Sequence, residues 1–174
     1  MPLILVTPLS AVPEALRRYQ PSHLISLLSP AYMIETPEGF PAQRHLRLAV
    51  NDVSDPSLGE HPPREEHVTA LLAFARAWDG SAPMLVHCWA GISRSMAAAF
   101  SILCDRTQQG GEIAVAREIR SRAPHAAPNS LIVRLADAQL AREGRMVDAR
   151  EAMGPGESAE EGTPVEFPLA AFGL

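Results

Sequence analysis

The middle of the chain holds a strand-loop-helix segment that limits the possible folds more than any other feature. Residues 84–86 are apolar and predict a buried strand, and residues 96–100 carry an apolar pattern into a predicted helix. Cys88 lies at the end of the strand, five loop residues follow it, and Arg94 and Ser95 stand where the helix begins. The backbone must therefore turn from a strand into a helix N-terminus within one short loop.

The loop has the features of an oxyanion site. The first turn of a helix leaves backbone N–H groups without partners, and the helix dipole adds partial positive charge there. An oxyanion is the natural ligand for such a concave array of amides. Gly91 gives the backbone the freedom to turn an N–H inward. The amides expected to line the cradle belong to Trp89, Ala90, Gly91, Ile92, Ser93 and Arg94.

The side chains at the two ends of the loop add a nucleophile and an anion clamp. A cysteine at a helix N-terminus has its thiolate form stabilised by the same amides, so we expect Cys88 to be reactive. The planar guanidinium of Arg94 can bind two phosphate oxygens at once. The hydroxyl of Ser95 can donate to the thiolate and make it a better leaving group. This combination predicts covalent catalysis on a bound phosphate ester.

The run from His87 to Ser95 resembles the signature His-Cys-X5-Arg-Ser/Thr of the cysteine-dependent protein phosphatases and meets it at every fixed position. The resemblance covers residues 20–143, strongly in the loop and loosely elsewhere. It implies a phosphomonoester hydrolase, of the protein tyrosine or dual-specificity type, that works through a cysteinyl-phosphate without metal or other cofactor. The implied substrate is a phosphorylated protein or a small phosphomonoester.

A phosphatase of this kind also needs an acid to protonate the leaving oxygen. Two carboxylates, Asp52 and Asp55, follow the third predicted strand, and ligands of open α/β sheets bind at such carboxyl ends. Either residue could instead form a local turn. Dual-specificity-type phosphatases carry their acid in a similar strand-then-Asp segment, so the resemblance favours Asp52 over Asp55.

Two supporting residues are also implied by the resemblance. A histidine before the nucleophile supports the loop through hydrogen bonds in this family, and His87 holds that position. The pair Pro128-Asn129 resembles a Pro-Asn pair whose amide braces the loop in small dual-specificity enzymes. Asn129 would also serve as a plain helix N-cap, and the two roles can coexist.

Apolar strand-like runs alternate with helical patterns along the chain, which predicts an α/β fold. We expect a mainly parallel central sheet of about four to five strands with helices on both faces, and the resemblance implies the cysteine-phosphatase fold. Residues 1–150 form the predicted phosphatase domain, and residues 151–174 form an acidic tail rich in Pro and Gly, mobile or docked peripherally. Predicted strands lie at 3–6, 23–28, 45–50 and 84–86, and predicted helices at 12–19, 64–78, 95–107, 112–121 and 130–143.

Composition excludes several other functions. The net charge is −5 and all fifteen basic residues are arginine, so we expect no binding to nucleic acid. The two cysteines lie sixteen positions apart without a metal-binding pattern, so we expect neither a metal site nor a disulfide. The apolar N-terminus meets Pro8 too soon for a signal or membrane helix, which predicts a cytoplasmic protein without a membrane partner. The alanine-rich, lysine-free composition is typical of a GC-rich bacterial genome.

Two functions of other classes stay open at this point. A rhodanese-like sulfurtransferase also places a cysteine in an amide-lined loop, but it needs neither Ser95 nor an upstream acid. Persulfide formation with thiosulfate would identify it. A non-catalytic phospho-binding module would keep Arg94 and the amides but would gain nothing from a reactive thiol. Slow alkylation of Cys88 near neutral pH would identify that module.

Overall fold

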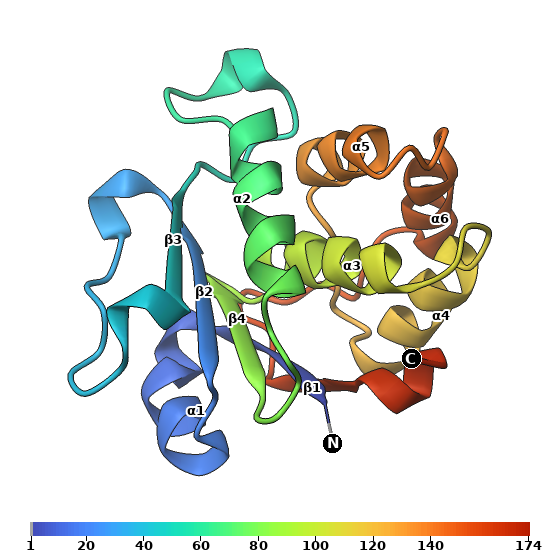
Figure 1. Ribbon diagram of the computed structural model, residues 1–174. Coiled ribbons are helices and arrows are strands. Elements are labelled where there is room, and N and C mark those ends of the chain that lie inside the picture. Colours follow the sequence, from blue (N-terminus) through green and yellow to red (C-terminus); the bar gives the residue numbers. More distant parts are fainter. Residues whose placement is uncertain (1) are drawn as a thin grey trace.

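A five-stranded sheet in the order β3-β2-β4-β1-β5 forms the centre of the protein (Figure 1). The computed structural model describes residues 2–174. Four strands run parallel, and β5 pairs antiparallel with β1 at one edge. The strands are β1 (Leu3–Pro8), β2 (His23–Leu28), β3 (His45–Ala49), β4 (Met84–Cys88) and β5 (Val165–Pro168).

Helices cover both faces of this sheet, as the alternating sequence pattern predicts. They are α1 (Val12–Tyr19), α2 (Glu65–Arg76), α3 (Arg94–Arg106), α4 (Glu112–Arg122), α5 (Ser130–Gln139) and α6 (Arg145–Met153). In Figure 1, α1 lies alone on one side of the sheet and the other five helices lie on the opposite side. The expected α/β class and mainly parallel sheet are confirmed.

The alternation of side chains along the strands divides the core into two layers. Ile4 and Val6 of β1 face the large core beneath α2 to α6, whereas Leu5 faces α1. Helix α3 is the centre of the large core, because every residue from Arg94 to Cys104 is buried. The small side chains of the run from Ala97 to Ala99 allow this helix to pack closely against the sheet.

The predicted helix at 130–143 is wrong in its last turn, because α5 ends at Gln139 and α6 begins at Arg145. Gly144 adopts a φ of +88° at the break, a conformation that glycine tolerates. The carboxylate of Asp137 accepts the backbone N–H groups of Gly144 at 2.8 Å and Met146 at 2.9 Å. This carboxylate therefore holds the start of a helix that no periodic apolar pattern indicated.

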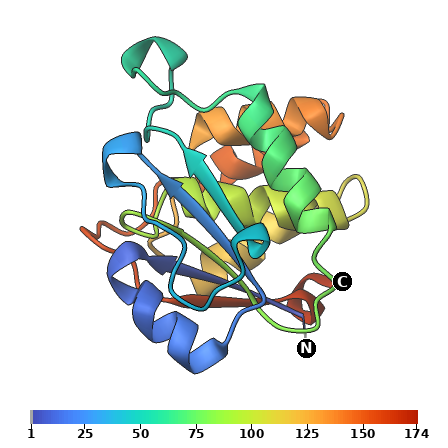
Figure 2. The same cartoon turned by 60° about the vertical axis from the view of Figure 1, so that its left-hand side comes forward.

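The chain after α6 returns to the sheet. Strand β5 pairs with β1, with Phe167 opposite Ile4, and the side chain of Phe167 is buried in the large core. Figure 2 shows this red segment running along β1, on the side away from α2. Within residues 2–174, no helix combines the length and the apolar character needed to cross a membrane.

Candidate active site

The loop between β4 and α3 has its carbonyl groups fixed by backbone donors from other parts of the chain. A trans peptide points its C=O and its N–H in opposite directions, so a carbonyl bonded outward leaves the next residue's N–H turned toward the centre of the loop. The N–H of Leu9 donates to Trp89 O at 3.0 Å, Gly162 to Ala90 O at 2.8 Å, Ala127 to Ile92 O at 3.0 Å and Asn129 to Ser93 O at 3.2 Å. These four hydrogen bonds turn the N–H groups of Ala90, Gly91, Ser93 and Arg94 toward the centre of the loop.

Gly91 permits the sharpest part of this loop. Its φ is +70°, which side chains of L-residues rarely adopt. A Cβ at this position would lie 2.7 Å from the backbone nitrogen of Pro8 and 2.9 Å from the carbonyl carbon of Thr7. The end of β1 therefore packs directly against the loop, and only glycine fits between them.

Cys88 and Ser95 meet at the base of the loop. Cys88 is the last residue of β4, and Ser95 is the second residue of α3. Their Sγ and Oγ atoms lie 3.1 Å apart, and both side chains are buried. The hydroxyl is in position to donate a hydrogen bond to a thiolate.

Arg94 is buried at the first position of α3 and is fixed by the strand end that precedes Asp52. Its Nη1 donates to Val50 O at 2.8 Å. Its Nε lies 3.9 Å from Oδ2 of Asp52 and, within residues 2–174, has no hydrogen-bond partner. A buried guanidinium with an unpartnered donor is suited to binding an anion in the loop.

The two candidate acids lie in different surroundings. Oδ1 of Asp52 accepts the Ser93 hydroxyl at 2.7 Å and the Asn129 amide at 2.9 Å, and its side chain is 40% exposed. Asp55 is exposed and accepts the N–H of Ser57 at 2.8 Å, which caps a short 3-10 turn. The hydrogen bond from the Ser57 hydroxyl, at 2.7 Å, and the one from the Ser57 N–H lower the pKa of Asp55 below its ordinary value. The structure therefore brings Asp52 to the loop and leaves Asp55 in a local turn.

Asn129 makes both kinds of contact that were considered for it. Its Oδ1 accepts the N–H of Ile132 at 3.0 Å and caps α5. Its Nδ2 donates to Asp52 and, at 3.1 Å, to the carbonyl of Val53. The side chain thus braces the segment that carries Asp52, while its backbone braces the loop between β4 and α3 at Ser93.

His87 lies at the end of a buried chain of hydrogen bonds that crosses the sheet. Its Nδ1 lies 3.3 Å from the carbonyl of Cys88, and its Nε2 lies 2.6 Å from the hydroxyl of Ser26. Ser26 also lies 2.8 Å from Nε2 of His45, whose Nδ1 is 3.0 Å from the hydroxyl of Thr36. Ser26 and His45 are supporting residues that sequence reasoning missed, because only the strand register brings them beside His87.

The imidazoles of His87 and His45, the two rings in this series of hydrogen bonds, are both held neutral. Burial is the main cause that lowers the pKa of His87 to about 4 and that of His45 to about 4. Since a carbonyl can only accept, Nδ1 of His87 carries the proton and Nε2 accepts from Ser26. The hydroxyl of Ser26 then accepts from His45, so every group in the chain is satisfied without a charge.

Two exposed aromatic residues stand beside the loop. Trp89 is 52% exposed and Tyr32 is 60% exposed, and their rings meet edge to face with centroids 5.0 Å apart. Tyr32 also lines an open hollow of about 610 Å³ that reaches Asp52, Leu58 and Glu60. An aromatic wall and a carboxylate therefore flank the approach to the loop.

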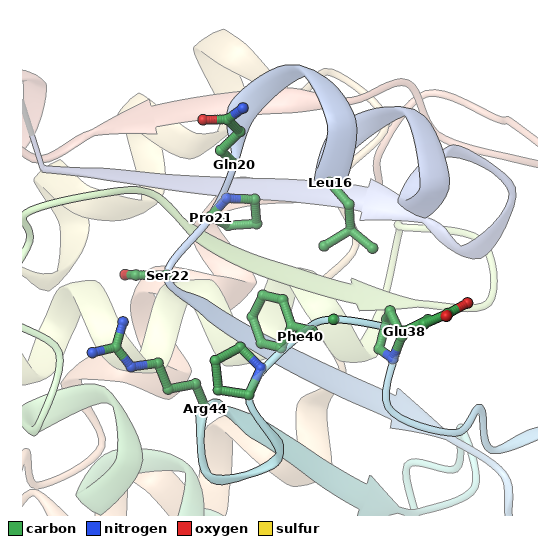
Figure 3. Close-up of a pocket in the computed structure, with 10 residues that line it drawn as sticks. Leu16, Gln20, Pro21, Ser22, Glu38, Phe40 and Arg44 are labelled. Carbon is green, nitrogen blue, oxygen red and sulfur yellow. The ribbon is translucent and has the colours of Figure 1, made fainter.

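Another hollow, of about 380 Å³, lies where strands β2 and β3 begin, at the opposite end of the strands from the loop. Leu16, Pro21, Phe40 and Arg44 are among its lining residues (Figure 3). Pro21 and Arg44 precede β2 and β3, whereas Cys88 ends β4, so this hollow does not belong to the site around the loop.

Residues 57–129 match the family model of protein-tyrosine phosphatase. The matched stretch includes Cys88, Arg94, Ser95 and Asn129 but begins after Asp52. The sequence matches no curated protein at a significant level.

Solved structures of phosphatases share the fold. DUSP15 is similar with a TM-score of 0.59 and 23% identity, over 91% of this chain and 96% of that one. A Cydia pomonella PTP-2 phosphatase is similar with a TM-score of 0.57 and 17% identity, over 78% of this chain and 84% of that one. PTPMT1 in complex with PI(5)P is similar with a TM-score of 0.57 and 16% identity, over 86% and 94%.

Proposed function

The chain belongs to the cysteine-dependent protein tyrosine phosphatase superfamily and is a phosphatase, and from this premise we propose that it hydrolyses phosphorylated protein side chains through a cysteinyl-phosphate, without metal. The observation that carries the proposal is the position of Asp52. Ser93 and Asn129 hold its carboxylate against the loop, 3.9 Å from the Arg94 guanidinium. A general acid belongs beside the bound ester in this way.

In the first step the Sγ of Cys88 attacks phosphorus. The S–P bond forms, the P–O bond to the leaving group breaks, and Asp52 gives its proton to the leaving oxygen. The loop amides and Arg94 bind the three equatorial oxygens and follow them into the transition state. These groups are fixed before substrate arrives, so little reorganisation opposes the reaction.

In the second step the ionised Asp52 takes a proton from water. The water oxygen attacks phosphorus, the P–S bond breaks, and inorganic phosphate is released. Ser95, 3.1 Å from the sulfur, stabilises the leaving thiolate. A sulfurtransferase would not need Asp52 or Ser95. A binding module would not need a hydroxyl group hydrogen-bonded to the cysteine sulfur.

The surroundings of the loop favour an aromatic phosphate ester on a protein over a phosphoinositide. Trp89 and Tyr32 offer ring faces and edges to the leaving group. The hollow beside Asp52 is lined by Asp52 and Glu60 and, within the described chain, by no arginine. Extra phosphates on an inositol ring would meet negative charge there.

The free thiols suit a reducing compartment, and we place the protein in the cytoplasm.

The test is hydrolysis of p-nitrophenyl phosphate in the presence of a chelator, with Cys88→Ser as the matched variant. We expect turnover by the wild type and none by the variant. A phosphotyrosine peptide, a phosphoserine peptide and a phosphoinositide are then compared by kcat/KM, and we expect the phosphotyrosine peptide to be preferred. Folded, reduced wild type without turnover would overturn the proposal, and persulfide formation with thiosulfate would replace it with sulfur transfer.

A further inference from the structure

The segment that joins α6 to β5 crosses the phosphate-binding loop. We call residues 154–164 the strap. The backbone N–H of Gly162 donates to Ala90 O at 2.8 Å, across a separation of 72 positions in the chain. Gly162 is the buried residue of the strap, and its neighbours on both sides are exposed. The strap lies beyond the stretch that matches the family model, so this contact is a feature of this chain's C-terminal segment.

The strap is anchored on both sides of that contact. Near its start, the N–H of Glu157 donates to Pro124 O at 2.8 Å, and Nη2 of Arg120 donates to Gly154 O at 3.1 Å. After Gly162 the chain enters β5, which pairs with β1. The Ser10 hydroxyl, just beyond β1, also donates to the carboxylate of Glu161. The Gly162 amide is therefore held at fixed points on either side.

The approach of the strap to the loop is too close for a side chain. A Cβ on Gly162 would lie 2.6 Å from Nε2 of His125 and 3.2 Å from the carbonyl oxygen of Gly91. A Cβ on Gly156 would lie 2.6 Å from the carbonyl oxygen of His125. The strap thus wraps around His125, and glycine at both points lets its backbone reach the loop.

This contact acts on a particular peptide plane. The Ala90 carbonyl and the Gly91 N–H belong to the same planar peptide, so a donor that fixes the carbonyl outward also aims the Gly91 N–H inward. The donors to the Trp89 and Ile92 carbonyls come from Leu9 and Ala127, outside the strap. The Ala90–Gly91 peptide is the one whose orientation depends on the strap.

We propose that the strap is a positioning element of the phosphate-binding loop, in which the Gly162 N–H orients the Ala90–Gly91 peptide for the oxyanion. The inference rests on the proposed function for the identity of the oxyanion. Without this hydrogen bond the Ala90–Gly91 peptide can turn its carbonyl toward the ligand. The loop then loses one donor and gains a repulsive acceptor.

The test compares two substitutions of Gly162 that differ in whether the backbone N–H is present. In a His125→Ala background, which makes room for a Cβ at position 162, Gly162→Ala retains the N–H and Gly162→Pro lacks it. Both proteins are alkylated with iodoacetate, an anion, and with iodoacetamide, its neutral analogue. The Cys104 thiol is buried and its pKa is raised by that burial, so Cys88 is the thiol that reacts.

We expect the ratio of the iodoacetate rate to the iodoacetamide rate to be about tenfold lower in the proline variant than in the alanine variant, because one hydrogen bond to an anion is lost. Equal ratios in the two folded proteins would overturn the proposal. The ratio needs no turnover, so it separates a failure of the strap from a failure of the phosphatase assignment.

A second measurement uses the wild type and does not depend on the folding of a variant. Hydrogen exchange of the Gly162 amide is followed with and without inorganic phosphate. If the strap and the loop are coupled, phosphate at 100 times its Kd should slow this exchange by up to about 100-fold. An exchange rate that phosphate at saturation does not change would overturn the proposal.

Discussion

The Asn129 amide donates a 2.9 Å hydrogen bond to Oδ1 of Asp52, although 77 positions separate the two residues in the chain. The same side chain caps α5 through its Oδ1. One residue therefore fixes both the start of a core helix and the carboxylate beside the phosphate-binding loop. A substitution that keeps the cap but loses the amide separates the two roles.

Asn129→Ser should retain the helix cap and lose the hydrogen bond to Asp52. We expect kcat for p-nitrophenyl phosphate to fall about tenfold, as for the loss of one hydrogen bond to a carboxylate. The free energy of unfolding should change little, since serine is a good N-cap. Asn129→Ala loses the cap as well and should be less stable by about 1 kcal/mol in urea unfolding. Full kcat in Asn129→Ser would show that the amide does not position Asp52.

The two acids can be separated by their dependence on the leaving group. Asp52→Asn should lower kcat for a phenyl phosphate by about 10²–10⁴, because the leaving oxygen must then depart without a proton. The loss should be smaller for p-nitrophenyl phosphate, whose leaving group needs less protonation. Asp55→Asn removes only a local turn contact and should change kcat less than twofold, roughly the scale of a surface substitution. A large loss of kcat in Asp55→Asn and a small one in Asp52→Asn would instead identify Asp55 as the acid.

Ser95→Ala should slow the breakdown of the cysteinyl-phosphate more than its formation. A hydrogen bond to a charged group is worth about 1.5–3 kcal/mol, so we expect the second step to slow by roughly 10–100-fold. Rapid mixing with p-nitrophenyl phosphate should then show a burst of nitrophenol of nearly one per Cys88. Ser101→Ala is a matched control, because that buried serine of α3 bonds only to Ala97 O, at 2.7 Å. If Ser95→Ala shows no burst, formation of the cysteinyl-phosphate is still slower than its breakdown, and Ser95 does not have the proposed role.

The parts of the structure that could be predicted from the sequence are those with local causes. Strand β4 could be predicted from its apolar run, which arises because both of its faces are covered. The loop could be predicted from the fixed spacing of Cys88, Arg94 and Ser95. Strand β5 is four residues long and bounded by prolines, so it leaves a weak periodic pattern.

Other parts of the site depend on strand register and on contacts between distant segments. Ser26 lies opposite His87 only because β2 and β4 pair in one register, which no local pattern specifies. The Gly162 contact joins a tail segment to a loop 72 positions away. Sequence reasoning therefore proposed His87 and Asn129 as supports of the loop but missed Ser26, His45 and Gly162, whose contacts depend on the tertiary fold.

The buried pair of His87 and His45 should make stability depend on pH. Each has a pKa of about 4 in the folded protein, against an ordinary value of 6.5. Between pH 6.5 and about 4 the unfolded chain therefore binds protons that the folded chain does not, and stability falls as the pH falls through this window. Each histidine should contribute a slope of up to about 1.4 kcal/mol per pH unit.

His45→Gln tests this linkage, because glutamine can keep a hydrogen bond to Ser26 but does not titrate. Urea unfolding of the wild type and the variant at pH 7.5 and pH 5 should show a smaller loss of stability on acidification in the variant. The Arg47 guanidinium further lowers the pKa of His45 and the Glu35 carboxylate opposes it, so moderate salt should change the slope little. Equal losses in the two proteins would show that His45 takes up its proton without unfolding.

Gly91→Ala should damage the phosphate-binding loop more than backbone strain alone can explain. A residue with a side chain at φ +70° costs about 1–2 kcal/mol, and Gly39→Ala, at φ +78° with no atom within 4 Å of its Cβ, measures that cost by itself. At Gly91 the new Cβ would also meet the Pro8 nitrogen at 2.7 Å. The atoms nearest to it are backbone atoms of Thr7 and Pro8, which cannot move aside as a flexible side chain could. The loop must shift to relieve this contact, which displaces the amides that bind the phosphoryl oxygens.

We therefore expect Gly91→Ala to lose more than about 100-fold in kcat/KM, the scale of a lost oxyanion donor, while Gly39→Ala keeps wild-type activity. Equal activity in the two variants would mean that the β1 end yields to the Cβ and that the cradle does not depend on this contact.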